Sequence, residues 1–244
     1  MIDSLEIQRR MEIIQDRGPI YNEFVYDSHI HEPWNAFSSL FFFIPVVFWI
    51  VFLWGRYKQH RIILLILPLL FLNGLGSTLF HAYRTSNVFL MLDWLPAALM
   101  SLSLSVYFWT KITRRWYFGI LCVLGFYASA VLVITTLGQG YRVLAPNIGY
   151  LFSGSAFLIP IIWSLYRNQW RHARYVLLTL FFLISALIFR LLDYPTPNPF
   201  PFLPQGTHFL WHVFSSFAVF TMGYYLYKSG QDALQESQKT TATK

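Results

Sequence analysis

Three histidines are spaced so that they can share one metal ion. His208 and His212 are four residues apart, which places both imidazoles on one face of a helix. His81 belongs to another apolar stretch and meets them if that stretch runs antiparallel to theirs. Two histidines one turn apart, with a third from elsewhere, form a common zinc site whose fourth position stays open for water in enzymes. The spacing therefore predicts a zinc ion held by His81, His208 and His212.

Ser77 and Asp93 are predicted to lie at the level of these histidines. Ser77 precedes His81 by one helical turn in the run Gly74–Ser77, where the glycines permit close approach of another helix or a substrate. Asp93 follows across a short link, and a carboxylate at membrane depth is a functional candidate because it is costly to bury. It can orient a ligand histidine by a hydrogen bond or serve as a general base.

Each of these residues also has a purely structural interpretation. Interfacial histidines can simply join neighbouring helices, and a serine inside a helix often bonds to its own backbone. Three histidines converging on one level with Ser77 and Asp93 favour a metal site. We interpret Arg190 and Asp193, three residues apart, as a structural ion pair.

The composition indicates which elements must position these residues. Of the 244 residues, 56% are hydrophobic and only 12% are charged, whereas a soluble domain carries about 25% charged residues. The composition excludes a soluble enzyme, a disordered chain and a nucleic-acid binder, despite the net charge of +7. The single cysteine, Cys122, excludes an internal disulfide and a Cys-x-x-Cys metal site.

The apolar residues form long runs, and a helix needs about 20 of them to cross a bilayer. The sequence predicts an all-α, polytopic bundle of seven transmembrane helices within residues 34–228. Residues 1–33 form an extracytoplasmic segment without the features of a signal peptide, and residues 229–244 form a disordered cytoplasmic tail. The predicted spans are 34–55, 62–83, 88–110, 116–137, 145–166, 174–193 and 207–228.

The basic residues predict the orientation of this integral multi-pass membrane protein. One side carries twelve Lys and Arg residues: Arg56, Lys58, Arg61, Lys111, Arg114, Arg115, Arg167, Arg171, Arg174, Lys228, Lys239 and Lys244. The other side carries five: Arg9, Arg10, Arg17, Arg84 and Arg142. Because basic residues are retained in the cytoplasm, we expect the N-terminus outside, the C-terminus inside and the histidines near the outer face.

The pattern of these motifs resembles the alkaline ceramidases, a family of the CREST superfamily of seven-span hydrolases. The likeness is carried by Gly76-Ser77-Thr78-Leu79-Phe80-His81, by Asp93 and by Gly206-Thr207-His208-Phe209-Leu210-Trp211-His212. Glu32-Pro33-Trp34-Asn35 with Ser38 is similar to the opening motif of that family. In architecture the resemblance extends from about residue 20 to residue 228.

The resemblance implies roles for individual residues. It implies that His81, His208 and His212 hold zinc, that Ser77 supports the oxyanion and that Asp93 handles the proton of the attacking water. It also implies a calcium ion next to the zinc, for which Glu23 and Glu32 resemble two carboxylate ligands. The alternative for these glutamates is a solvated interfacial segment.

The expected function is an intramembrane zinc-dependent amidase that hydrolyses ceramide or a related N-acyl lipid to a fatty acid and a long-chain amine. The alternative is a receptor-like or lipid-binding protein with little or no turnover. Haem ligation by histidines on facing helices is a third possibility. The expected partners are the membrane and a lipid substrate entering from the bilayer, with no nucleic-acid or protein partner predicted.

Overall fold

The computed structural model describes residues 4–137, 145–193 and 198–242, and the regular elements among them are all helical. The helices are α1 (Ser4–Ile13), α2 (Pro33–Ser39), α3 (Phe43–Phe52), α4 (Arg61–Tyr83), α5 (Asn87–Thr113), α6 (Trp116–Thr136), α7 (Ala145–Arg167), α8 (Ala173–Asp193) and α9 (His208–Ala242). The predicted all-α fold class is confirmed for these residues. Arg142 and Lys244, which contribute to the predicted orientation, lie outside them.

Five helical stretches of the described chain are long and apolar enough to cross a membrane. They are Pro33–Phe52, Arg61–Tyr83, Asn87–Thr113, Trp116–Thr136 and Ala173–Asp193. A shorter apolar stretch, Leu151–Arg167, lies in α7 within the fifth predicted span. The chain is therefore an integral multi-pass membrane protein. The count of seven spans stays a prediction, because α9, which contains the last predicted span, is not among the stretches that qualify.

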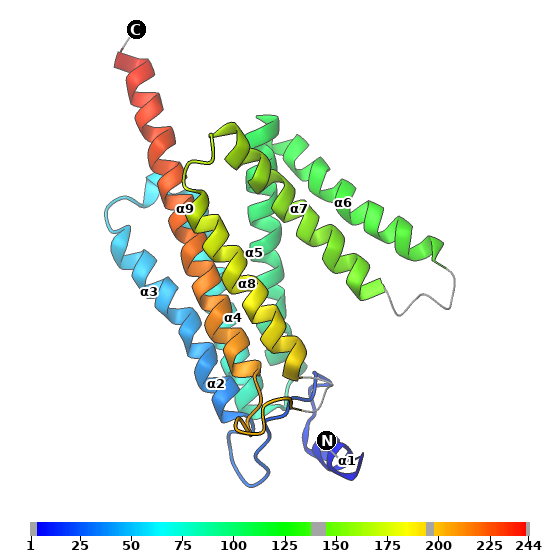
Figure 1. Cartoon of the computed structure of the whole chain (residues 1–244). Helices are drawn as coiled ribbons and strands as arrows, with labels where there is room; N and C mark the ends of the chain where they lie inside the picture. The colour runs from blue at the N-terminus through cyan, green and yellow to red at the C-terminus, as the bar shows by residue number, and fades with distance from the viewer. Residues whose placement is uncertain (1–3, 138–144, 194–197, 243–244) are drawn as a thin grey trace. The chain divides into compact units, whose positions relative to one another are not determined.

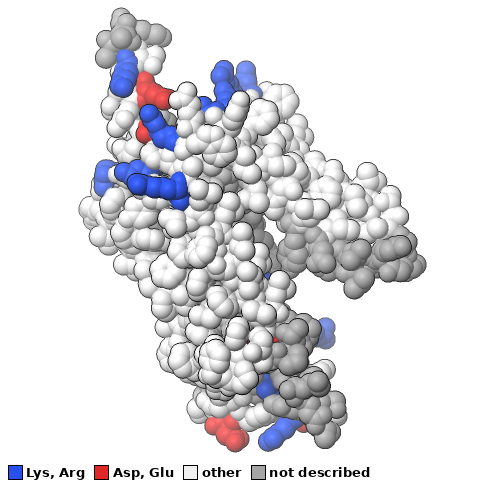
Figure 2. Space-filling model, viewed as in Figure 1, with Lys and Arg blue, Asp and Glu red and all other residues white. Residues whose placement is uncertain are grey.

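The charged side chains follow the pattern expected of membrane helices. On the face seen in Figure 2, Lys and Arg gather toward the helix ends, and the middle of the helices carries almost no charge. An uncharged middle is required because a charged side chain in hydrocarbon costs several kcal/mol.

Residues 1–97 and 174–244 form one compact unit. Within it, α2 packs against α4 and α9, and α3 packs against the same two helices, as Figure 1 shows. A Cβ atom added to Gly76 of α4 would collide with the backbone of Leu92 in α5. The absence of a side chain at this position therefore lets α5 approach α4 closely, one residue before Ser77.

Residues 98–173 form a second compact unit. In this unit α6 packs along α7, and the indole Nε1–H of Trp109 donates a hydrogen bond to the carbonyl of Ala156 at 3.0 Å. All the residues that the sequence singles out for chemistry belong to the first unit, so the site is described from that unit alone.

The end of the chain differs from the predicted disordered tail. Instead of ending near residue 228, α9 continues as one helix to Ala242. Leu234, Gln235 and Glu236 are good helix formers. They extend a helix that already exists, so they avoid the unfavourable nucleation step. The amide Nε2 of Gln231 also lies 3.1 Å from Nε2 of the buried His60, which ties the start of this extension to the link before α4.

Candidate metal centre

The last turn of α4 and the first turns of α9 bring three histidines together. His81 is completely buried, and His208 and His212 are only 2% and 1% exposed. The ring centroids are separated by 5.2 Å for His81 and His208, 4.9 Å for His81 and His212, and 4.8 Å for His208 and His212. One ligand nitrogen from each ring lies within 4.8 Å of the other two. The predicted convergence of the three imidazoles is confirmed.

Two nitrogens of this cluster test whether the residues suit a metal ion. Nε2 of His81 and Nδ1 of His208 are buried and have no hydrogen-bond partner among the described residues. A buried polar atom left without a partner costs free energy, and neutral imidazole nitrogen is a preferred ligand of zinc. The unpaired nitrogens and the all-nitrogen donor set therefore fit a metal ion such as zinc.

The other ring nitrogens of His81 and His212 are held by side chains. Nδ1 of His81 lies 2.5 Å from Oε2 of Glu32, so it carries the proton and leaves the lone pair on Nε2. Nδ1 of His212 lies 2.9 Å from Oγ of Ser38, whose own hydroxyl donates to the carbonyl of Asn35. The Ser38 oxygen must therefore accept the His212 proton, which leaves the lone pair of His212 on Nε2, the atom a metal ion would use. Partners of this kind fix the tautomer of metal-binding histidines.

Asp193 fixes the start of α9 and with it the position of His208. Its Oδ2 accepts the backbone N–H groups of Thr207 at 2.7 Å and His208 at 2.8 Å, and its Oδ1 accepts that of Asn22 at 2.8 Å. A carboxylate at a helix N-terminus satisfies unpaired N–H groups and the positive end of the helix dipole. Gly206 has φ +74°, and a Cβ there would collide with this carboxylate. Asp193 thus has a backbone role in place of the predicted pair with Arg190, whose guanidinium stacks over Trp211 at 5.1 Å.

Tyr21 covers the cluster from the N-terminal segment. Its ring stacks on His208 with 3.8 Å between centroids and lies 5.3 Å from that of His81. Burial raises the pKa of the Tyr21 hydroxyl well above its ordinary value, so the side chain stays neutral. The sequence gives no periodic signal for this contact, because the segment is irregular and reaches the site only through tertiary folding.

The structure also brings the two predicted polar residues to the histidines. Oγ of Ser77 lies 3.4 Å from Nε2 of His212 and 2.9 Å from Oγ of Ser39. The Asp93 carboxyl interacts electrostatically with His81 and lies within hydrogen-bonding reach of the Ser77 hydroxyl. The amide of Asn73 donates to the backbone carbonyl of Asp93 and joins α5 to α4 at this level.

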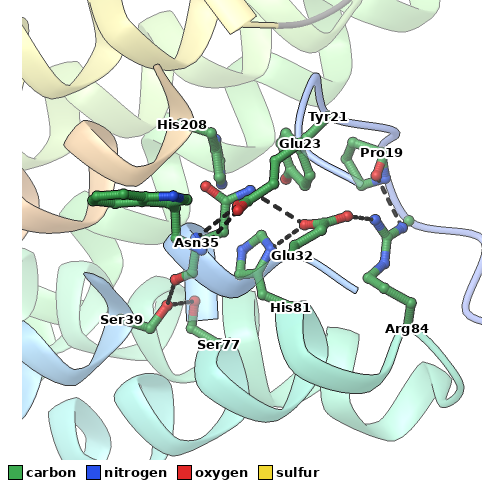
Figure 3. Close-up of polar contacts among 12 residues, drawn as sticks. Pro19, Tyr21, Glu23, Glu32, Asn35, Ser39, Ser77, His81, Arg84 and His208 are labelled. Carbon is green, nitrogen blue, oxygen red and sulfur yellow. Dashed lines mark hydrogen bonds and ion pairs between the residues drawn. The ribbon is translucent and has the colours of Figure 1, made fainter. Parts of the chain in front are cut away.

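The two glutamates proposed for calcium lie beside the histidines, but protein donors hold their oxygens (Figure 3). Oε1 and Oε2 of Glu23 accept the backbone N–H groups of Trp34 at 2.7 Å and Asn35 at 2.9 Å, at the start of α2. Oε1 of Glu32 accepts from the guanidinium of Arg84, and Oε2 accepts from His81. Burial raises the pKa of Glu23 to about 7, although the two N–H groups work against this shift.

The sequence did not predict several residues that contact the cluster or its partners: Asp16, Tyr21, Ser39 and Arg84. It also did not predict that Ser38, bonded to the carbonyl of Asn35, would contact His212. An arginine directly after an apolar run is the signal that the sequence offers for Arg84, because a charge near membrane depth needs a partner.

The fold and the site together define a class: an integral multi-pass membrane protein of helices with a buried three-histidine cluster that can hold a metal ion. Comparison with protein-family models and with curated proteins gives no match for this chain. Function is therefore argued from the site.

Proposed function

We propose that this protein is an intramembrane zinc-dependent amidase that hydrolyses ceramide or a related N-acyl lipid, as its resemblance to the alkaline ceramidases implies. The observation that carries the proposal is the buried cluster of His81, His208 and His212, in which two ring nitrogens have no partner in the described chain. Three histidines with a fourth position open are the donor set of catalytic zinc sites. When bound, zinc would supply a Lewis acid that polarises an acyl carbonyl and makes a nearby water more acidic.

The proposed roles of the chain's own residues follow from their positions. The Ser77 hydroxyl, beside His212, would donate a hydrogen bond to the carbonyl oxygen as negative charge develops on it. The Asp93 carboxyl would take the proton of the attacking water and pass it to the leaving amine nitrogen. The water oxygen then stays with the acyl carbon while the carbon–nitrogen bond breaks. The products are a free fatty acid and a long-chain amine.

We further propose that the substrate reaches this site from the outer half of the bilayer. The excess of basic residues on the opposite side supports this orientation. On α2, next to the buried Asn35 and Ser38, the side chains of Trp34 and Phe37 are 55% and 62% exposed. Exposed aromatic residues of this kind suit contact with lipid at the membrane interface.

The test combines metal analysis with hydrolysis. The purified protein is expected to contain one zinc per chain by elemental analysis and to release labelled fatty acid from ceramide with a labelled acyl chain, measured by mass spectrometry. His208→Ala should lose both zinc and hydrolysis. His29→Ala is the matched control, because His29 is an exposed histidine of the N-terminal segment. A His208→Ala variant that hydrolyses ceramide at full rate without metal would refute the proposal.

The burial of all three histidines favours one other candidate, a receptor-like or lipid-binding protein in which the metal is structural. Such a protein would retain zinc and bind a fatty acid but release none from labelled ceramide over hours. The same assay therefore separates the two functions.

A further inference from the structure

Arg84 is a completely buried cation at the edge of the metal centre. It follows the last residue of α4 and has φ +52°, a left-handed conformation that is unfavourable for a residue with a side chain. Its guanidinium lies 4.6 Å above the ring of Phe80. Burial of a charge is costly unless the group is paired and hydrogen-bonded, so the partners of Arg84 explain its position.

Those partners are oxygen atoms of the N-terminal segment. Nε and Nη2 of Arg84 donate to the two carboxylate oxygens of Asp16 at 2.8 Å and 3.1 Å, and Nη2 also donates to the carbonyl of Pro19 at 2.9 Å. Nη1 donates to Oε1 of Glu32. Two buried carboxylates and a backbone carbonyl converge on one positive group, as Figure 3 shows for Glu32 and Pro19.

Such oxygens are typical ligands of calcium, which takes six to eight of them. The oxygens beside this centre do not fit that ion as the chain stands. Both oxygens of Glu23 accept backbone N–H groups, and all four carboxylate oxygens of Asp16 and Glu32 accept from protein donors. A calcium ion bound by Asp16 and Glu32 would have to displace the guanidinium of Arg84.

We propose that the guanidinium of Arg84 takes the place of the calcium ion that the resemblance implies beside the zinc, so that the N-terminal segment is held without calcium. The same contact orients Glu32, whose other oxygen holds Nδ1 of His81. Arg84 is thus a positioning residue for the histidine cluster. Two backbone hydrogen bonds also hold this segment: the N–H of Gln15 donates to the carbonyl of Arg84 at 2.9 Å, and the N–H of His31 donates to the carbonyl of Ala82 at 2.9 Å.

The first test measures binding of ⁴⁵Ca²⁺ to the full-length wild-type protein with its own metal content, by equilibrium dialysis. No stoichiometric binding is expected at about 1 mM free calcium, the weakest range of protein calcium sites. One calcium bound per wild-type chain would overturn the proposal. This measurement needs no variant and no lipid hydrolysis, so its outcome is independent of the proposed amidase function.

The second test measures how firmly the segment is held. Trypsin can cut after Arg17, which is exposed and lies next to Asp16. In Arg84→Ala this cleavage should be at least about tenfold faster than in wild type, because cleavage follows the population of the open segment. Arg9→Gln is the matched control: it removes an exposed arginine of the same segment and should leave cleavage after Arg17 within about twofold of the wild-type rate.

Added calcium should slow the cleavage of Arg84→Ala, since that variant leaves the oxygens of Asp16, Pro19 and Glu32 without a cation, and sodium at equal ionic strength should not. If Arg84→Ala does not fold, Arg84→Lys replaces it. A lysine keeps the charge but loses the planar fork, so Arg84→Lys should be cleaved faster than both wild type and Arg9→Gln. Cleavage of the Arg84 variant at the control rate, or no protection of Arg84→Ala by calcium, would overturn the proposal.

Discussion

Replacing Glu32 by glutamine should weaken metal binding at the histidine cluster. Oε2 of Glu32 is 2.5 Å from Nδ1 of His81, and both side chains are completely buried, so solvent cannot replace the contact. Glutamine keeps the shape of the side chain but removes the charge that favours a proton on Nδ1 and a lone pair on Nε2. Loss of such a partner costs metal affinity about 10- to 100-fold, or about 1.4–2.8 kcal/mol.

The assay is competition between the purified variant and a fluorescent zinc chelator at fixed pH. Glu23→Gln is the matched control, because Glu23 is a buried glutamate of the same segment whose two oxygens accept the backbone N–H groups of Trp34 and Asn35 instead of a histidine N–H. Its zinc affinity should stay within about twofold of wild type. An unchanged affinity in Glu32→Gln, or an equal loss in both variants, would show that Glu32 does not act through His81.

Three further predictions concern stability, measured as the thermal midpoint in detergent. Gly206→Ala should lower the midpoint, because it costs about 1–3 kcal/mol of unfolding free energy: φ is +74° and the new Cβ would meet Asp193. It should also weaken zinc binding, and an unchanged midpoint would contradict this. Gly76→Ala should cost about 1–3 kcal/mol by overpacking against α5, whereas Gly125→Ala, with open space at its Cβ, should be neutral or stabilising; equal effects would refute the packing argument. Burial raises the pKa of Glu23 from its ordinary 4.5 to about 7, so the folded state binds this proton more tightly, and stability is lost as the pH rises through that window. The thermal midpoint of wild type should therefore fall relative to that of Glu23→Gln as the pH rises from about 4.5 to 7. An equal dependence of the midpoint on pH in the two proteins would contradict this prediction.

The helices of the membrane bundle were predictable because their signal is local. Runs of about 20 apolar residues require helices in lipid whatever the tertiary structure is. The predicted disordered tail shows the limit of that reasoning, since α9 extends to Ala242. Low hydropathy ends a membrane span, but it does not end a helix whose next residues also favour helical structure.

The histidine cluster was predictable for a similar reason. The four-residue spacing of His208 and His212 sets a common face, and antiparallel spans return His81 to the same level. The partners of the cluster were not predictable in this way. Asp193 was expected to pair with Arg190 from sequence proximity, yet its oxygens accept N–H groups of Asn22, Thr207 and His208, one of them 171 positions away.

The amino-acid sequence by itself determined the all-helical membrane class and which histidines can meet, because hydropathy and helical periodicity act over a few turns of one segment. Only the tertiary structure decided how the irregular segment before α2 closes over those histidines. There Tyr21 stacks on His208, and the oxygens of Asp16 and Glu32 surround Arg84. The physical reason is that buried charges and imidazoles pair with groups that are close in three dimensions. The spacing of residues along an irregular segment does not show which groups those are.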